Sequence, residues 1–127
     1  MNNDITTETS NVENKASIVL IDIYKPFADI IASVLRKKSF EADTYGSPTE
    51  LLSNIHKYAK DTKICMGQEF GEYQIKGIEL AKKLNELGYT KLYLFTGYRL
   101  DDLDIPYYVT AISKDESENI INVLSAP

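Results

Sequence analysis

The stretch "ASIVLIDI", residues Ala16–Ile23, decides which fold this sequence predicts. Its centre is Ile, Val, Leu and Ile without a polar residue between them, and Asp22 follows this run. A strand with one solvated face alternates apolar and polar residues, whereas a strand buried on both faces is apolar throughout. We therefore predict a central strand of a parallel sheet, the kind of sheet that needs helices on both of its faces.

Four further segments have the character of strands, and helical patterns separate them. The strand-like segments are "FEADTY" (40–45), "KICM" (63–66), "KLYLFTG" (91–97) and "YYVTAIS" (107–113). Amphipathic helices are expected near residues 24–40, 47–58, 75–88 and 116–124. The segment "YRLDDLDIP" (98–106) is short and acidic and ends in Pro106, so a full helix is not expected there.

Local signals predict the ends and the inner faces of these helices. "SPTE" (47–50) is a capping box with proline in the first turn, and Gly88 is a C-terminal stop. The predicted inward residues of the first helix are Phe27, Ile30, Ile31, Val34 and Leu35, and those of the third are Ile78, Ala81, Leu84 and Leu87.

Five strands that alternate with helices predict an α/β fold of the flavodoxin-like type. The expected architecture is a three-layer sandwich with a five-stranded parallel sheet in the order 2-1-3-4-5, helices on both faces, and a fourth helix that is short or missing. Residues 16–127 form this domain. Residues 1–15 are almost free of apolar side chains, so we expect a disordered tail or linker there.

The composition excludes several classes of function. The chain has 127 residues and a net charge of −5, which argues against a sequence-independent grip on nucleic acid. No apolar run approaches the roughly 18 residues of a membrane span, and the first 15 residues lack the features of a signal peptide. Cys65 is the single cysteine, so no internal disulfide is possible. We therefore expect a cytoplasmic protein.

Polar residues follow the predicted strands where a ligand site is expected. In sheets of this kind, ligands bind beyond the carboxyl ends of the strands. Asp22 ends the first strand, Thr96 the fourth and Lys114 the fifth, while Gly67 and Glu69 follow the third. The sequence therefore predicts that an acid, a hydroxyl and a lysine converge at one edge of the sheet.

These residues, together with three longer motifs, resemble the receiver domains of two-component response regulators and of hybrid histidine kinases. The similarity extends over about residues 16–124. The longer motifs are "GIELAKKL" (77–84) at the start of the third helix, "LYLFTGY" (92–98), and "ISKD" (112–115). The short link after the fourth strand is similar to that of receivers attached to hybrid kinases, where the fourth helix is often reduced.

The resemblance implies a phosphorylation site with a bound metal ion. Receivers hold Mg²⁺ with two acids after strand 1 and an aspartate after strand 3, and this aspartate accepts a phosphoryl group from a phosphohistidine. The resemblance assigns Asp22 to the metal position, and Thr96 and Lys114 to the switch and phosphate-contact positions. Carboxylates suit Mg²⁺, and a carboxylate nucleophile gives the labile acyl phosphate that such a relay needs.

The sequence departs from the receiver pattern at two positions. Ile23 stands where the second acid is expected. The residue after "ICM" is Gly67, whereas counting back eight residues from Gly77 leads to Glu69. We favour the strand count, because burial fixes a strand while loops absorb insertions. The phosphoacceptor position is then Gly67; in the alternative register Glu69 replaces the aspartate and forms an acidic pocket with Asp22.

These departures predict a degenerate receiver, or pseudo-receiver, that acts as a protein-interaction module without normal aspartate phosphorylation. We expect no enzymatic activity and no cofactor, since Asp22 alone is a weak Mg²⁺ site. The expected partners are a histidine kinase, a phosphotransfer protein or an output protein, and a homodimer is compatible with the sequence. The alternatives are a phosphorylatable receiver with Glu69 as an atypical acceptor, and a flavodoxin-like domain that binds a small ligand.

Overall fold

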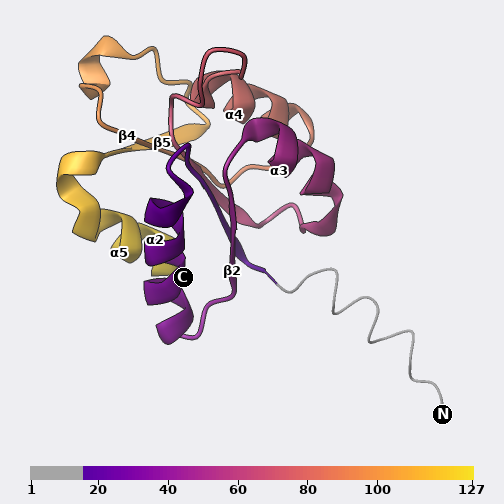
Figure 1. Ribbon diagram of the computed structural model, residues 1–127, viewed down its shortest axis with the longest axis vertical. Coiled ribbons are helices and arrows are strands. Elements are labelled where there is room, and N and C mark those ends of the chain that lie inside the picture. Colours follow the sequence, from indigo (N-terminus) through magenta and orange to yellow (C-terminus); the bar gives the residue numbers. More distant parts are fainter. Residues whose placement is uncertain (1–15) are drawn as a thin grey trace.

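The computed structural model describes residues 16–127, which contain a five-stranded parallel sheet between two layers of helices (Figure 1). The predicted tail, residues 1–15, lies outside the described residues. The strands are β1 (Ile18–Ile21), β2 (Ala42–Tyr45), β3 (Lys63–Met66), β4 (Leu92–Thr96) and β5 (Val109–Ser113). Their order is β2-β1-β3-β4-β5 and every pair is parallel, so the predicted topology is confirmed.

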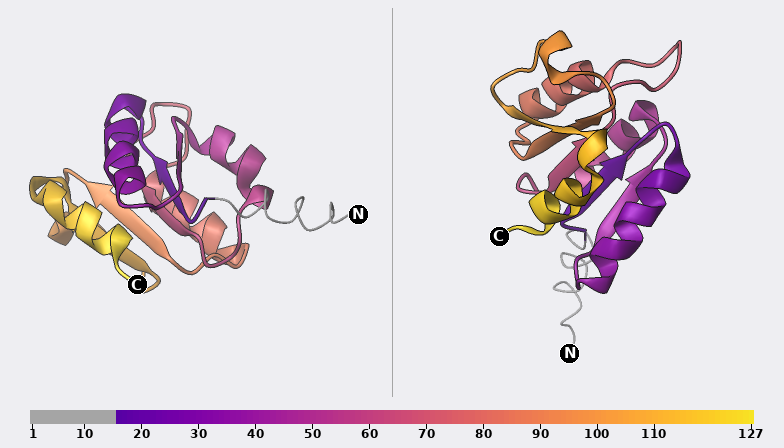
Figure 2. Two further views of the ribbon diagram at one scale, coloured as in Figure 1. Left: turned by 90° about the horizontal axis from the view of Figure 1, so that it is seen from below. Right: turned by 90° about the vertical axis from the view of Figure 1, so that its left-hand side faces the viewer.

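Two α-helices cover each face of the sheet (Figure 2). One face carries α2 (Lys25–Lys37) and α5 (Ser117–Ser125), and the other carries α3 (Pro48–Asn54) and α4 (Gly77–Glu86). Short 3₁₀ turns complete the described chain: η1 (Ile55–Lys57), η2 (Leu100–Asp102) and η3 (Lys114–Glu116). The connection between β4 and β5 contains only η2, which confirms the prediction of a short or missing helix.

The core is divided by the sheet into two buried clusters. Successive strand residues point to opposite faces, so Ile18 and Leu20 pack with α2 and α5 while Val19 and Ile21 pack with α3 and α4. β1 thus faces a buried hydrophobic cluster on both sides, which is why its sequence has no alternation.

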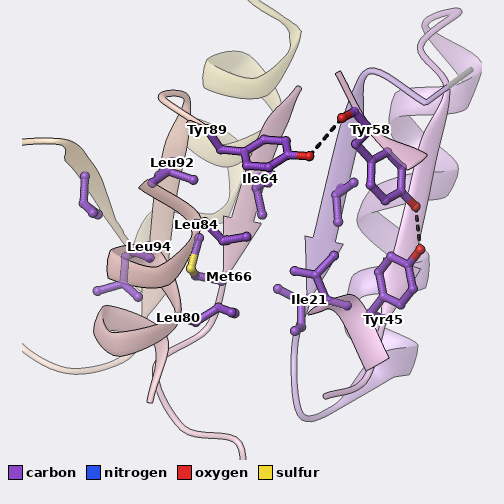
Figure 3. Close-up of a cluster of buried hydrophobic side chains, with 14 of the residues drawn as sticks. Ile21, Tyr45, Tyr58, Ile64, Met66, Leu80, Leu84, Tyr89, Leu92 and Leu94 are labelled. Carbon is purple, nitrogen blue, oxygen red and sulfur yellow. Dashed lines mark hydrogen bonds between the residues drawn. The ribbon is translucent and has the colours of Figure 1, made fainter. Parts of the chain in front are cut away.

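The cluster that packs with α3 and α4, here called the α3–α4 cluster, contains three buried tyrosines that are linked by hydrogen bonds: Tyr45, Tyr58 and Tyr89 (Figure 3). The Tyr45 and Tyr58 hydroxyls are 2.6 Å apart, and the Tyr58 hydroxyl donates to Asp43 at 2.6 Å. The Tyr89 hydroxyl donates to the backbone carbonyl of Tyr58 at 2.9 Å. Burial raises the pKa of Tyr58. These bonds satisfy hydroxyl groups that would otherwise be costly to bury.

The predicted inner faces of two helices need correction. In α2 the buried residues are Ala28, Ile31, Ala32 and Leu35, whereas Ile30 is 62% exposed and Val34 36%. Because Ala28 and Ala32 are small, α2 can pack closely on the sheet with the face that carries them. The helix is therefore rotated relative to the prediction, and Ile30 and Val34 turn outward. In the same way, Leu80 is buried in α4 while Leu87 is 48% exposed.

The predicted helix ends are mostly correct. Ser47 caps α3 by accepting a hydrogen bond from the Glu50 backbone N–H at 3.2 Å. The Glu50 carboxylate accepts from the Gly46 N–H rather than from Ser47, so the predicted capping box is only half formed. Gly88 has a φ of +103° just after α4, the left-handed conformation expected of a C-terminal stop.

Candidate functional site

The carboxyl ends of β1, β3, β4 and β5 surround a hollow of about 290 Å³. Its lining includes all five residues predicted to form a site: Asp22, Gly67, Glu69, Thr96 and Lys114. The parallel topology places these residues at one edge, because all strands end on the same side of the sheet. Their contacts divide them into two groups.

Asp22 and Lys114 form an ion pair at the inner end of the hollow. Asp22 is buried, and its Oδ2 lies 3.4 Å from the Lys114 Nζ. The other oxygen, Oδ1, accepts a hydrogen bond from the Tyr24 N–H at 2.9 Å. Of the two acidic residues that line the hollow, Asp22 is the one that pairs with Lys114, while Glu69 pairs with Lys76.

Two stacked aromatic rings support the same lysine. The Phe27 and Phe95 ring centroids are 5.5 Å apart and nearly parallel. The Lys114 Nζ lies 5.5 Å from the first centroid and 5.8 Å from the second, within cation–π range. The ammonium group thus has an anion and two ring faces as partners within the domain itself.

Gly67 lies directly beside this ion pair. Met66 pairs with Ile21 in the sheet, and the Gly67 N–H donates to the Ile21 carbonyl at 3.0 Å, so residue 67 follows β3 as Asp22 follows β1. A Cβ atom at residue 67 would lie 3.2 Å from the Asp22 Oδ2. The structure therefore agrees with the count along the strand, in which residue 67 directly follows β3. The position that faces Asp22 is a glycine and carries no side chain.

The start of α4 holds this part of β3 in place. Gln68 is buried; its side-chain oxygen accepts from the Ile78 N–H at 3.0 Å, and its backbone carbonyl accepts from the Gly77 N–H at 2.8 Å. A Cβ atom at Gly77 would overlap the Gly67 carbonyl oxygen and lie 2.8 Å from the Leu94 Cδ1. Gly77 is thus required by a close approach of two backbones.

Glu69 belongs to a second group, at the outer rim of the hollow. Both of its carboxylate oxygens accept from the Lys76 Nζ, at 2.8 and 2.9 Å, and Oε2 also accepts from the Tyr98 hydroxyl at 3.0 Å. The Lys76 hydrogen bond, followed by that of Tyr98, lowers the pKa of the Glu69 carboxyl. Asp22 and Glu69 line the same hollow, but each binds a different lysine.

Thr96 ends β4 and shapes the turn after it. Its side chain is buried, and Oγ1 accepts from the Tyr98 N–H at 3.1 Å. This bond gives the hydroxyl a structural partner within its own turn.

The residues at this edge do not fit the Mg²⁺ ion that a receiver would hold. Asp22 supplies one carboxylate, and Lys114 already contacts it. Ile23 is apolar and 56% exposed, and Gly67 has no side chain to offer. Across residues 16–127, no three His, Cys, Asp or Glu side chains are grouped as a metal ion would require.

Sequence reasoning missed the partners that hold these groups in place. Lys76 and Tyr98 bind Glu69 from a loop and from the turn after β4, and Gln68 caps a helix that starts nine residues later. The stacking of Phe27 on Phe95 joins a helix to a strand. Lys76, Tyr98 and Gln68 are polar, but no pattern of spacing in the sequence indicates any of these contacts.

A scan against protein-family models finds none that matches the chain, and a search of curated proteins finds no match either. In the described part of the chain, every helix is too short or too polar to span a bilayer.

Proposed function

We propose that this domain is a degenerate receiver that acts as a protein-interaction module in two-component signalling without aspartate phosphorylation. The observation that carries the proposal is Gly67, which stands beside Asp22 at the end of β3 without a side chain. Phosphoryl transfer to a receiver needs a carboxylate nucleophile at that point. The sheet order and the positions of Asp22, Thr96 and Lys114 support the receiver resemblance.

The charges around Gly67 support the same proposal. In a working site the lysine would meet the anionic phosphoryl group. Here the Lys114 ammonium already contacts Asp22 and two aromatic rings. The ion pair balances its own charge, so the domain can hold one stable conformation without a phosphoryl group or a metal ion.

The partners that fit this proposal are proteins. A histidine kinase, a phosphotransfer protein or an output protein would bind the domain surface, and self-association into a dimer belongs to the same class of event. The domain would carry out no chemical reaction. Signalling proteins of this kind work in the cytoplasm, where a single unpaired cysteine such as Cys65 stays reduced.

The first alternative, Glu69 as an atypical phosphoacceptor, has weaker support. Its carboxylate accepts hydrogen bonds from Lys76 and Tyr98, which lower its nucleophilicity, and its cation partner is Lys76 and not Lys114. The second alternative, a small-ligand site, has the hollow of about 290 Å³ in its favour. A ligand that copurifies with the protein and slows amide hydrogen exchange at Thr96 and Gly97, which line the hollow, would favour that alternative.

Incubation with acetyl phosphate and Mg²⁺, followed by intact mass spectrometry, tests the proposal. We expect no phosphoryl adduct on the native protein. A double variant, Ile23→Asp with Gly67→Asp, restores the missing carboxylates and serves as the positive comparison. A stoichiometric adduct on the native protein that disappears in Glu69→Gln would overturn the proposal in favour of the atypical acceptor.

A further inference from the structure

The link between β4 and β5, residues 97–108, makes few hydrogen bonds with the rest of the described domain. Its backbone hydrogen bonds are local, from Asp102 to Arg99 and from Leu103 to Leu100. Apart from the two strands that it connects, one hydrogen bond joins the link to another segment of the described chain: the bond from the Tyr98 hydroxyl to Glu69. This bond is therefore the polar contact that ties the first part of the link, near β4, to another segment.

Glu69 is itself fixed to the start of α4. The Lys76 Nζ binds both oxygens of Glu69, and the Lys76 backbone N–H donates to the Glu79 side chain at 3.2 Å within the first turn of the helix. Tyr98 is thus tied through Glu69 and Lys76 to a rigid element. We call Glu69, Lys76 and Tyr98 the latch.

Tyr98 also stands between two hollows. The first is the hollow beside Gly67, and the second, also about 290 Å³, is lined by residues that include Leu100, Asp101 and Asp115. Gly97 and Tyr98 line both hollows. Gly97 and the latched Tyr98 are thus the residues that the two hollows have in common.

The far half of the link is held differently. Leu103, Ile105 and Tyr108 are partly buried against the α3–α4 cluster. Gly97, in contrast, has nothing within 4 Å of the place where a Cβ atom would stand. The link is therefore anchored by apolar packing at its end near β5, while there is open space beside Gly97.

We propose that Tyr98 is a gate, held shut by Glu69 and Lys76, whose release joins the two hollows into one groove along the ends of β4 and β5. The gate gives the domain a way to change its surface that needs no phosphoryl group. It goes beyond the proposed function and rests only on contacts of the described residues. The proposal for Tyr98 therefore holds whether or not the phosphorylation assay yields an adduct on the native protein.

Amide hydrogen exchange measured by NMR tests the gate with the variant Tyr98→Phe, which removes one hydroxyl and keeps the ring. We expect the amide of Asp102, which donates to Arg99 beside Tyr98, to exchange about fivefold faster, the effect of losing one partly exposed hydrogen bond. The amides of β1 and β3 should stay unchanged. Tyr107→Phe is the matched control, because this tyrosine is on the same link and its side chain is 97% exposed.

Access to the first hollow supplies a second measurement. With Cys65→Ala and Gly67→Cys as background, the single thiol lies in the lining of the hollow and leaves the hydrogen bond between Thr96 and Tyr98 intact. We expect it to react with a small maleimide about fivefold faster when Tyr98→Phe or Glu69→Gln is added. Unchanged exchange in the link together with unchanged thiol reactivity would overturn the proposal, as would equal effects from Tyr107→Phe.

Discussion

Two carboxylates line the hollow at the end of the sheet, and the chain positions each of them and its lysine partner in a different way. Asp22 and Lys114 are placed by β1 and β5, and the Asp22 side chain is 8% exposed. Glu69 and Lys76 are placed by a loop and by the first turn of a helix, and their side chains are 43% and 54% exposed. The inner pair is 3.4 Å apart, whereas the outer pair makes two bonds of 2.8 and 2.9 Å.

Burial, and not distance, decides which pair matters more for stability. An exposed ion pair gains little, because water and salt screen it. A buried carboxylate that loses its cation remains desolvated and uncompensated. The shorter outer pair is therefore expected to contribute to the position of a loop, and the longer inner pair to the stability of the fold.

The largest effect is expected from Gly77→Ala, which disturbs the backbone under the inner pair. The new methyl group overlaps the Gly67 carbonyl oxygen and crowds Leu94, so we expect a loss of about 3 kcal/mol in the free energy of unfolding. Urea denaturation measures it. Gly97→Ala is the matched control, since its methyl group meets open space and should change the stability by less than about 0.5 kcal/mol.

The next effect compares the two lysines directly. Lys114→Ala leaves the buried Asp22 carboxylate without its cation, and we expect a loss of about 1–2 kcal/mol in the same urea experiment. Lys76→Ala removes the exposed partner and should cost less. Equal losses, or a larger loss for Lys76→Ala, would mean that the two pairs have been ranked wrongly.

A smaller effect is expected from the pH dependence of the outer pair. The hydrogen bonds from Lys76 and Tyr98 lower the folded-state pKa of Glu69 below the ordinary value of 4.5. Glu69 then adds stability that is fully present above that ordinary value and is lost as the pH falls through the lowered folded pKa. Thermal unfolding of the native protein and of Glu69→Gln should therefore differ at neutral pH and converge in acid. A difference that persists below the lowered pKa would contradict this role for the carboxylate.

The smallest expected effect is a difference in how strongly salt changes the contribution of each ion pair to stability. Screening acts on exposed charges and much less on buried ones. Raising the salt concentration should shrink the already small cost of Lys76→Ala by a larger fraction than that of Lys114→Ala, because only the inner pair has a buried carboxylate. Thermal melts of both variants at low and high ionic strength measure this difference.

The sequence predicts that Asp22 and Lys114 lie at the same edge of the sheet because strands dictate their positions, although it does not decide whether Lys114 pairs with Asp22 or with Glu69. An uninterrupted apolar run identifies β1, the ends of parallel strands meet at one edge, and Asp22 and Lys114 are the residues that follow two of them. The same logic identifies Gly67 as the neighbour of Asp22. Burial fixes how a strand pairs with its neighbours, so counting residues along the strand is enough to place Gly67 beside Asp22.

The outer pair could not be predicted, because loop geometry sets it. Glu69 and Lys76 are seven residues apart across a loop, and Tyr98 comes from a different connection. Helix rotation is similarly uncertain: the apolar periodicity of α2 fits two adjacent faces, and Ala28 and Ala32 decide between them through close packing. Such choices depend on the whole tertiary structure.

The central claim is that residue 67 leaves the site without a phosphoacceptor. Beryllofluoride, a mimic of the phosphoryl group on a carboxylate, tests it most directly when added with Mg²⁺ and followed by ¹⁹F NMR. We predict no bound fluoride signal with the native protein. A stoichiometric bound signal that persists in Glu69→Gln and disappears in Asp22→Asn would show a working site next to Gly67 and would contradict the account.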